Sequence, residues 1–484
     1  MYLLILAVII FMIVLCKILI FKPLRRALHW KTGFFITAAA LVLSVYGILL
    51  LPAFLGIFLL ALGVFLLIFG FLLIFKRVFT TSNILGLILI GLSILLLTFP
   101  LFLGNINEAG TAWAWGHNSS GQLGNGTFTT AFAPENVRNI SNIISIDGGN
   151  AHSLGLQRNG VVWTWGSNSS GQLGDGTAIT SNIPVRVSNI SDIEAVAGGG
   201  SFSLALKDNG TVWAWGNNFF GQLGDGTNTS SLVPVQVSGI SDIIAIDSGS
   251  SHSLALQKDG TVWAWGLNSS GQLGNGGFIN SNLPVQVNPV AGIKFIACGN
   301  AHSLAVDEDG TVWAWGNNSQ GQLGDGSFVN KSTPVQVVNI SDISAVAGGS
   351  LHSLAVEDNG IVWSWGFNFY GQLGDGTNTT SPIPVQVIDI PDIRVLAAGD
   401  NHSLALDLDD NLWAWGRGSL GELGNGTTFN RNTPQKNSSI ANINAVSAGA
   451  NHSLAVENAV LIPPIIIILL VVLLFIFGIT LAFI

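Results

Sequence analysis

The hydrophobic pattern divides the chain into regions of two kinds. Long, uninterrupted apolar runs fill the first 103 residues and the last 24, whereas the region between them alternates apolar and polar positions over short stretches. A membrane-spanning helix needs about 20 consecutive apolar residues. The long runs therefore predict five transmembrane helices, over 1–21, 34–51, 53–75, 84–103 and 461–484.

Positive charges between these runs predict their orientation. Four Lys or Arg residues lie between 22 and 31, and Lys76 and Arg77 lie in the third connection. Loops rich in Lys and Arg stay in the cytoplasm, which places residue 104 onward on the extracytoplasmic side and the C-terminus in the cytoplasm. A cleaved signal peptide is the alternative for the first run, but its charge should precede the apolar stretch, and here it follows.

The predicted helices contain no Asp, Glu or His. Ion pathways and proton relays in membranes depend on such residues. We therefore interpret the helices as anchors in the lipid bilayer and not as a transport pathway.

The central region consists of seven repeats of 50 residues. Trp-x-Trp-Gly recurs without insertion or deletion, followed each time by Gly-Gln-Leu-Gly-Asp/Asn-Gly, a proline and His-Ser-Leu-Ala, with few changes such as Phe202 and Glu422. Frequent Gly and Pro exclude helix, and period-two alternation predicts strands. In one repeat these are 243–246, 253–256, 261–265 and 284–287, with a tight turn at Asp259–Gly260. The Trp pairs begin at 113, 163, 213, 263, 313, 363 and 413.

These motifs resemble the regulator of chromosome condensation repeat over about residues 110–458. The resemblance implies a seven-bladed β-propeller, and four short strands per repeat are the content of one blade. The predicted fold class is thus an all-β seven-bladed propeller plus about five transmembrane α-helices. The predicted domains are a membrane domain at 1–103, the propeller at 104–458 and a C-terminal helix at 459–484.

The ends of the repeat region predict how the ring closes. The region starts at Gly110-Thr-Ala-Trp and ends at His452-Ser-Leu-Ala-Val-Glu. These are the two halves of a hairpin that the other repeats form with an intact turn. Pairing the two halves closes the ring, removes both sheet edges and brings the predicted fourth and fifth helices together at the missing turn.

Charge narrows the function classes. Residues 1–103 hold seven Lys or Arg and no acid, whereas residues 104–458 hold eleven Lys or Arg and 27 acids, a net charge of −16. Nucleic-acid binding needs clustered Lys and Arg, so the acidic propeller argues against it. No disulfide is predicted, because Cys16 lies inside the first apolar run and Cys298 lies far away in the repeat region.

No motif predicts catalysis or a cofactor. Histidine recurs once per repeat, which places the rings far apart around the propeller, so packing or hydrogen bonding is expected in preference to a metal site. Asp and Asn after Gly-Gln-Leu-Gly suit turn geometry, and a calcium site needs more converging oxygens. Cys298 stands where other repeats have Gly, Ala or Ser and is interpreted as a buried small residue.

Residues that differ between repeats are the candidates for recognition. Aromatic side chains on loops serve as interface anchors, although packing between blades explains them equally well. The segment after Gly-Asp/Asn-Gly also varies and is the second place to search. The candidate protein-binding residues, all directly after Trp-Gly, are His117, Phe219, Phe220, Phe367, Phe369, Tyr370 and Arg417.

The predicted function is therefore a membrane-anchored, extracytoplasmic protein-binding or scaffold module without catalysis. The resemblance implies guanine-nucleotide exchange on a small GTPase as an alternative, but the chain lacks a basic tail and the predicted topology separates it from the cytosol. Inhibition of an extracellular enzyme and catalysis at the propeller axis are further alternatives. The sequence identifies neither the protein partner nor the oligomeric state.

Overall fold

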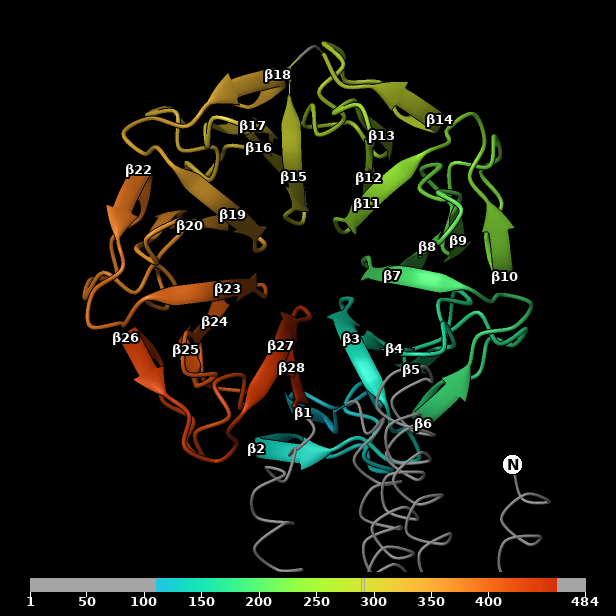
Figure 1. Cartoon of the computed structure of the whole chain (residues 1–484), viewed down its shortest axis with the longest axis horizontal. Helices are drawn as coiled ribbons and strands as arrows, with labels where there is room; N and C mark the ends of the chain where they lie inside the picture. The colour runs from blue at the N-terminus through green and yellow to red at the C-terminus, as the bar shows by residue number, and fades with distance from the viewer. Residues whose placement is uncertain (1–109, 289, 291, 459–484) are drawn as a thin grey trace, which may run out of the picture. The chain divides into compact units, whose positions relative to one another are not determined.

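The computed structural model describes residues 110–288, 290 and 292–458, which form a ring of seven four-stranded antiparallel sheets (Figure 1). The predicted seven-bladed propeller is confirmed. Among these described residues there is no helix, and hence none that could cross a membrane. The five predicted transmembrane segments lie outside the described residues.

Each blade uses the four strands expected from one repeat, and we number the blades by their Trp-x-Trp-Gly strand. Blade 1 consists of β27 (Ile443–Ala448), β28 (His452–Glu457), β1 (Ala112–Gly116) and β2 (Ala131–Asn136). Blade 2 consists of β3 (Ile143–Gly148), β4 (His152–Gln157), β5 (Val162–Gly166) and β6 (Ser181–Arg186). Blade 3 consists of β7 (Ile193–Gly198), β8 (Phe202–Lys207), β9 (Val212–Gly216) and β10 (Ser231–Gln236). Blade 4 consists of β11 (Ile243–Ser248), β12 (His252–Gln257), β13 (Val262–Gly266) and β14 (Ser281–Gln286). Blade 5 consists of β15 (Ile293–Cys298), β16 (His302–Asp307), β17 (Val312–Gly316) and β18 (Lys331–Gln336). Blade 6 consists of β19 (Ile343–Gly348), β20 (His352–Glu357), β21 (Val362–Gly366) and β22 (Ser381–Gln386). Blade 7 consists of β23 (Ile393–Ala398), β24 (His402–Asp407), β25 (Leu412–Gly416) and β26 (Arg431–Lys436).

The ring closes within blade 1, as predicted. Strand β1 pairs antiparallel with β28, and Trp113 lies opposite Ala455. The intact hairpin of blade 4 has the same register, with Trp263 opposite Ala255. The first and last described strands therefore form one hairpin without a turn.

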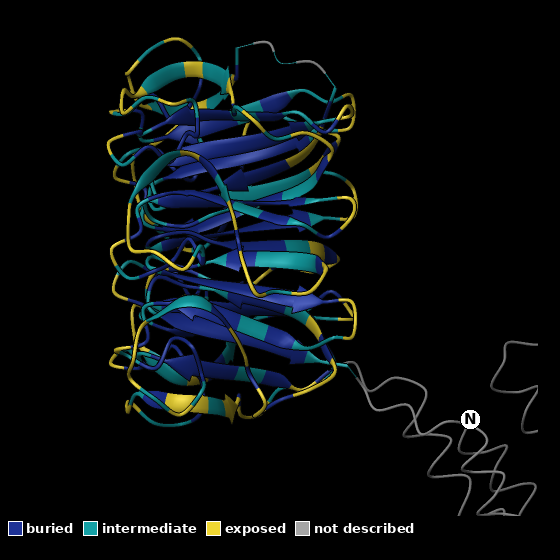
Figure 2. Ribbon diagram, turned by 90° about the vertical axis from the view of Figure 1, so that its left-hand side faces the viewer, coloured by how far each residue is buried: buried dark blue, intermediate teal, exposed yellow. Residues whose placement is uncertain are grey.

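Strand direction defines two faces of the ring. In each blade the second strand runs toward a tight turn such as 258–260, and the third runs back to a long loop such as 267–280. We call the face with the tight turns the terminal face, because Gly110 and Asn458 lie at the equivalent points of blade 1. The opposite side is the loop face. Exposed loops occupy both edges of the ring in the side view (Figure 2).

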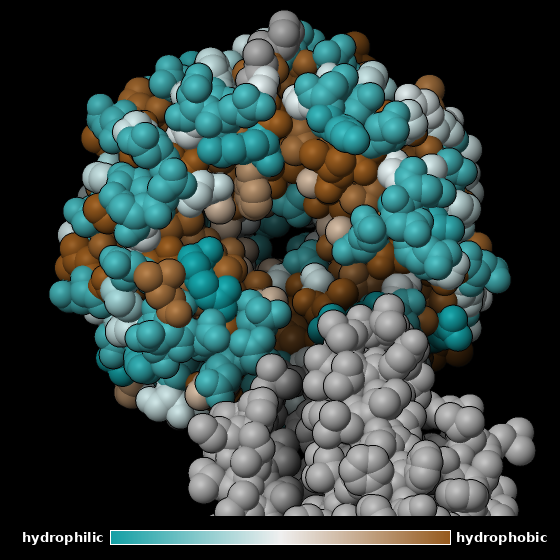
Figure 3. Space-filling model, viewed as in Figure 1, coloured by the Kyte–Doolittle hydropathy of each residue, from teal (hydrophilic) through white to brown (hydrophobic). Residues whose placement is uncertain are grey.

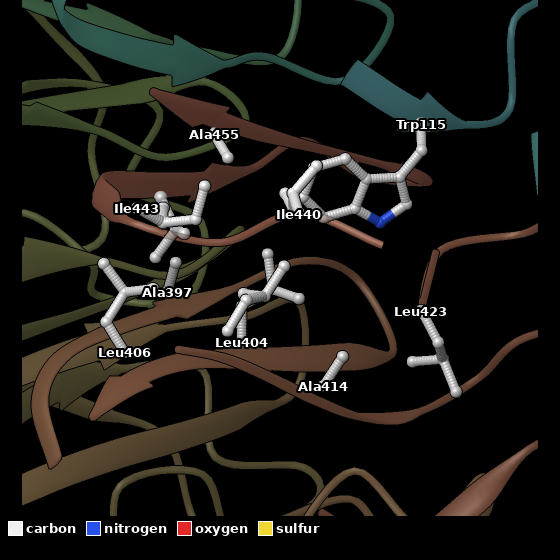
Figure 4. Packing of buried hydrophobic residues seen from close by; sticks show 11 residues of the cluster. Trp115, Ala397, Leu404, Leu406, Ala414, Leu423, Ile440, Ile443 and Ala455 are labelled. Carbon is white, nitrogen blue, oxygen red and sulfur yellow. The ribbon is translucent and has the colours of Figure 1, made fainter. Parts of the chain in front are cut away.

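The hydrophobic core is divided into seven clusters, one between each pair of neighbouring blades. The second tryptophan of each repeat is fully buried in one of these clusters. Trp115 of blade 1, for example, packs against Leu404 and Ile440 of the blade 7 cluster (Figure 4). Packing between blades, and not within one sheet, therefore supplies most of the buried apolar contact.

One backbone carbonyl ties each blade to the next. The carbonyl oxygen of Gln222 accepts hydrogen bonds from Trp265 Nε1 at 2.9 Å and from Ser253 Oγ at 3.0 Å, both in the following blade. All seven junctions repeat this pattern, including the closing one, where Glu422 binds Trp115 and Ser453. The second tryptophan of each repeat thus combines full burial with a satisfied N–H group.

Candidate functional site

The loops that follow the tryptophan strands form the loop face, and a buried asparagine shapes each of them. Asn268 Oδ1 accepts a hydrogen bond from the Leu273 amide at 2.9 Å, while Asn268 Nδ2 donates to the Ile279 carbonyl at 3.1 Å. Blades 1 to 6 have an equivalent Asn that is completely buried. Blade 7 has Gly418, where a β-carbon would lie 2.4 Å from the Phe429 carbonyl oxygen. The loops are therefore held in defined conformations before any partner binds.

The predicted turn role of the Asp and Asn residues in these loops is confirmed. Asp225 Oδ1 accepts hydrogen bonds from both the amide and the hydroxyl of Thr227, each at 2.9 Å. Asn218 Nδ2 donates to the same carboxylate oxygen at 3.2 Å. This carboxylate thus serves to fix the loop.

The loop of blade 3 presents an aromatic pair. Phe219 and Phe220 are in edge-to-face contact with ring centroids 5.0 Å apart. Phe219 is 73 % exposed, whereas Phe220 is half-buried. Asn228 Nδ2 donates to the Phe219 backbone carbonyl at 3.1 Å and fixes the backbone that carries this exposed ring. Packing between blades therefore does not account for Phe219.

A larger aromatic group covers the loop of blade 6. Phe367 stacks on Phe369 at 6.4 Å, and both rings contact Tyr370 edge to face. Phe369 is 67 % exposed, while Phe367 and Tyr370 are half-buried. The guanidinium of Arg417 from blade 7 lies 5.8 Å from the Tyr370 ring centroid, in cation–π geometry. The structure thus brings four of the seven predicted residues into one surface.

Arg417 is also bound within its own loop and to blade 1. Its Nε donates to Glu422 Oε1 of the same loop at 2.5 Å, and its Nη2 donates to Asn451 of blade 1. In blade 3 the same two loop positions hold Asn217 and Gln222, joined by a neutral hydrogen bond of 2.9 Å. Arg417 and Glu422 are therefore a charged version of a contact within the loop, and Arg417 is half-buried.

His117 lies at the equivalent loop position of blade 1, next to blade 7 around the ring. Its Nδ1 is 3.2 Å from Gln122 Nε2, so the ring joins the same contact within the loop. His117 is half-buried. The candidates of blades 6, 7 and 1 are thus consecutive around the loop face, and Phe219 and Phe220 lie three blades from Phe369.

The repeated histidines form a buried belt between blades, which confirms the hydrogen-bonding role predicted for them. His252 Nε2 lies 3.0 Å from Ser303 Oγ of the next blade, and the belt closes where His452 meets Ser153 at 2.8 Å. Ser153 donates its only proton to the Gln122 carbonyl, so the serine accepts and the histidine Nε2 carries the hydrogen. Six of seven junctions have this bond, and Phe202 interrupts the belt at the seventh.

The belt histidines are neutral. Burial lowers the pKa of His152 and His252 to about 4 and that of His302 to about 3. A glycine covers the other edge of each ring, because a β-carbon on Gly249 would lie 2.3 Å from His252 Cε1. Nδ1 of every belt histidine has no hydrogen-bond partner among the described residues.

A channel of about 360 Å³ runs between the first strands of the blades. Its opening on the terminal face lies among apolar side chains, while polar side chains gather toward the rim (Figure 3). Three aspartates that sequence reasoning missed line it, namely Asp147, Asp247 and Asp400. Asp147 accepts hydrogen bonds from Gly198 N and Ser447 Oγ, and Asp247 accepts one from Cys298 N at 2.6 Å.

Burial raises the pKa of all three channel aspartates, and the neighbouring Asp147 helps to raise that of Asp247 to about 7. The sequence did mark Asp147 and Asp247 as unusual, because four of the seven repeats, for example at Ala197, have alanine at this position. Cys298, beside Asp247, is buried as predicted, and burial raises the pKa of its thiol. Within the described part of the chain, no three His, Cys, Asp or Glu side chains are placed to hold a metal ion.

Comparison with known proteins agrees with this geometry. The family model described as the RCC1-like domain matches residues 111–455. The fold is similar to that of human WBSCR16, at 23 % identity and a TM-score of 0.67, covering 73 % of this chain and all of that one. Yeast RCC1 (Prp20), solved bound to Kap60, is 23 % identical with a TM-score of 0.66, covering 73 % of this chain and 90 % of that one.

A second structure of Prp20p from Saccharomyces cerevisiae, described with its binding to Gsp1p and histones, is 24 % identical with a TM-score of 0.65, covering 73 % of this chain and 92 % of that one. No curated protein sequence matches the chain. At this level of identity the solved structures establish the fold. The match to the family model spans more than half of the chain, and the protein belongs to the RCC1-like domain family.

Proposed function

We propose that the chain is a membrane-anchored, extracytoplasmic module that binds a protein partner on the loop face of its propeller, without catalysis. The observation that carries the proposal is the exposure of Phe219 and Phe369 on loops held by internal hydrogen bonds. Rigid, exposed aromatic side chains are the usual anchors of protein interfaces.

The position of the two ends of the propeller supports this assignment. Gly110 and Asn458 both lie on the terminal face, opposite the loops that carry Phe219 and Phe369. The apolar runs that precede and follow the propeller support anchoring in a membrane. A propeller anchored through these two points leaves the loop face accessible to a partner.

Removal of the two exposed rings should abolish partner binding. We expect F219S/F369S to lose a partner captured from the native membrane, because each anchor contributes about 2 kcal/mol, or about thirtyfold in affinity. Serine occupies the equivalent position in the other five blades. Affinity capture with the full chain, followed by titration of the captured protein, measures the loss.

The matched control is I244S/L408S, which removes two similarly exposed side chains from the terminal face. It should bind as the parent does. A partner that F219S/F369S retains at full affinity, or an equal loss in the control, contradicts the proposal. Nucleotide release from a small GTPase stimulated by the chain would instead support the exchange activity that the family name implies.

The membrane topology has its own test. We expect S269C, in a C16S/C298S background, to react with an impermeant thiol reagent in intact cells, because Ser269 is exposed on the loop face. Labelling of the same variant after lysis gives the maximum signal. Protection in intact cells with full labelling after lysis would place the propeller in the cytosol and reverse the proposed orientation.

A further inference from the structure

The loop face carries a complete ring of exposed apolar side chains. Each of the seven blades contributes at least one, from the loop after the tryptophan strand, and all are between 53 % and 84 % exposed. We call this set the apolar crown. Its members are Phe128, Ile179, Phe219, Phe278, Ile279, Phe328, Val329, Phe369 and Phe429.

Two loop positions alternate in supplying the crown. Blades 3 and 6 use Phe219 and Phe369, and an asparagine from the second half of each loop donates to the backbone carbonyl of that phenylalanine. The other five blades have Ser at this first position and place Phe, Ile or Val in the second half of the loop instead. The buried Asn268 binds the Ile279 carbonyl directly, so the crown is as well held there as in blade 3.

Exposed charged side chains lie on the terminal face, opposite the apolar crown. The loops and inner turns of the loop face hold no exposed Asp, Glu, Lys or Arg among the described residues, and their half-buried charges bind neighbouring side chains, as in the Arg417–Glu422 pair. The terminal face carries exposed acids in nearly every blade. Examples are Asp192, Asp208, Asp242, Glu308, Asp358 and Asp392.

We propose that the crown is a self-association surface, on which the loop face of a second copy of this chain docks. This rests on the proposed function, because it names the partner of the same face. A protein with a net charge of −16 over residues 104–458 repels its own copies wherever its acids are exposed. The loops and inner turns of the loop face carry no exposed charge among the described residues, so two copies meet there without like-charge contact.

The area of the crown fits this occupant. A fully exposed aromatic side chain presents about 200 Å², so nine side chains that are each more than half exposed present on the order of 1,000 Å². A stable protein interface buries about 800 Å² per partner. Two rings of equal diameter also bring crown against crown, as a two-fold dimer requires of one self-complementary patch. An anionic bilayer would instead be repelled by the acidic propeller.

Photo-crosslinking tests the contact in the full chain. Benzoylphenylalanine at Phe219 or Phe369 should yield a covalent dimer on irradiation, and benzoylphenylalanine at Phe295, which is exposed on the terminal face, should not. Equal dimer yield from all three positions, or no dimer from the crown positions, would overturn the proposal.

Mass measurement of the full chain, reconstituted at one copy per nanodisc, tests how strongly two copies associate, because associated copies join two discs into one particle. Discs should pair, and F219S/I279S/F369S/F429S should weaken pairing at least a hundredfold. The matched variant I244S/F295S/I388S/L408S removes four exposed side chains from the terminal face and should pair normally.

The remaining outcomes separate this proposal from the proposed function. Discs that stay single, yet capture a different protein through Phe219 and Phe369, refute the second copy and leave the binding function standing. Discs that stay single and instead recruit protein-free neutral vesicles through the crown refute both and assign the crown to a lipid surface.

Discussion

Acidification should unfold the propeller well above the pH at which its carboxylates alone would do so. Each belt histidine is neutral when buried, with a pKa of about 4 or 3 for His152, His252, His302, His352 and His452, and takes up a proton on unfolding below about pH 6.5. The stability from each is present above pH 6.5 and is lost as the pH falls toward the folded pKa. At pH 5 the loss is about 2 kcal/mol per histidine.

The three channel aspartates, Asp147, Asp247 and Asp400, act in the opposite direction. Burial raises their pKa, to about 7 for Asp247, so they keep protons that the unfolded chain releases above about pH 4. Their stabilising effect is therefore present at low pH and is lost as the pH rises through the folded pKa. Six histidines against three aspartates leave a net uptake of roughly three protons on unfolding, or about 4 kcal/mol per pH unit.

A domain with about 5–15 kcal/mol of stability is unfolded within about one to four pH units below 6.5 at that slope. Denaturant titrations of the full chain at several pH values, followed by tryptophan fluorescence, measure it. The variant H252F copies the residue that Phe202 provides in blade 3 and should reduce the slope by about 1.4 kcal/mol per pH unit. An unchanged slope in H252F, or stability independent of pH between 7 and 5, would refute the role of the belt.

Loss of a buried tryptophan at the closing junction should have the second large effect. Trp115 is fully buried against Leu404 and Ile440, and its Nε1 donates to the Glu422 carbonyl at 2.8 Å. W115A leaves a cavity between blades 7 and 1 and should lower the free energy of unfolding by about 3–5 kcal/mol.

The neighbouring tryptophan is the control. Trp113 is half-buried, and its Nε1 donates to Glu457 at 2.9 Å. W113A should therefore cost clearly less than W115A, and W265A, which removes the equivalent buried ring of blade 4, should cost about as much as W115A. Equal costs for W113A and W115A would show that burial between blades does not dominate the stability of the ring.

The architecture was predictable because one unit is repeated seven times. Any single strand assignment, such as 253–256, is supported by six further copies, and the two unmatched halves at Gly110 and Glu457 left only one way to close the ring. The roles of His252 and Asp225 followed from the same reasoning, because a residue that occurs once per blade serves the junction or the loop of every blade.

Departures from the repeat were harder to interpret, because repetition says nothing about them. Arg417 was predicted as a binding residue, although Glu422 replaces Gln in the same repeat and the two charges pair. That joint substitution was the available signal. Exposure was not predictable either. Adjacent rings such as Phe219 and Phe220 differ in burial because the loop turns between them, and the sequence pattern carries no period there.

The pairing of β1 with β28 also governs when the propeller can be completed during synthesis. Trp113 and Glu457, which are bonded across this pair, are 344 residues apart. At about 10 residues per second, roughly half a minute separates their emergence from the ribosome. Throughout that interval the β1–β2 pair lacks β28, the second partner strand of β1, and the apolar faces of both end blades stay open. A chaperone that shields unpaired strands is needed most during this interval, and a chain truncated before His452 retains the open edge permanently.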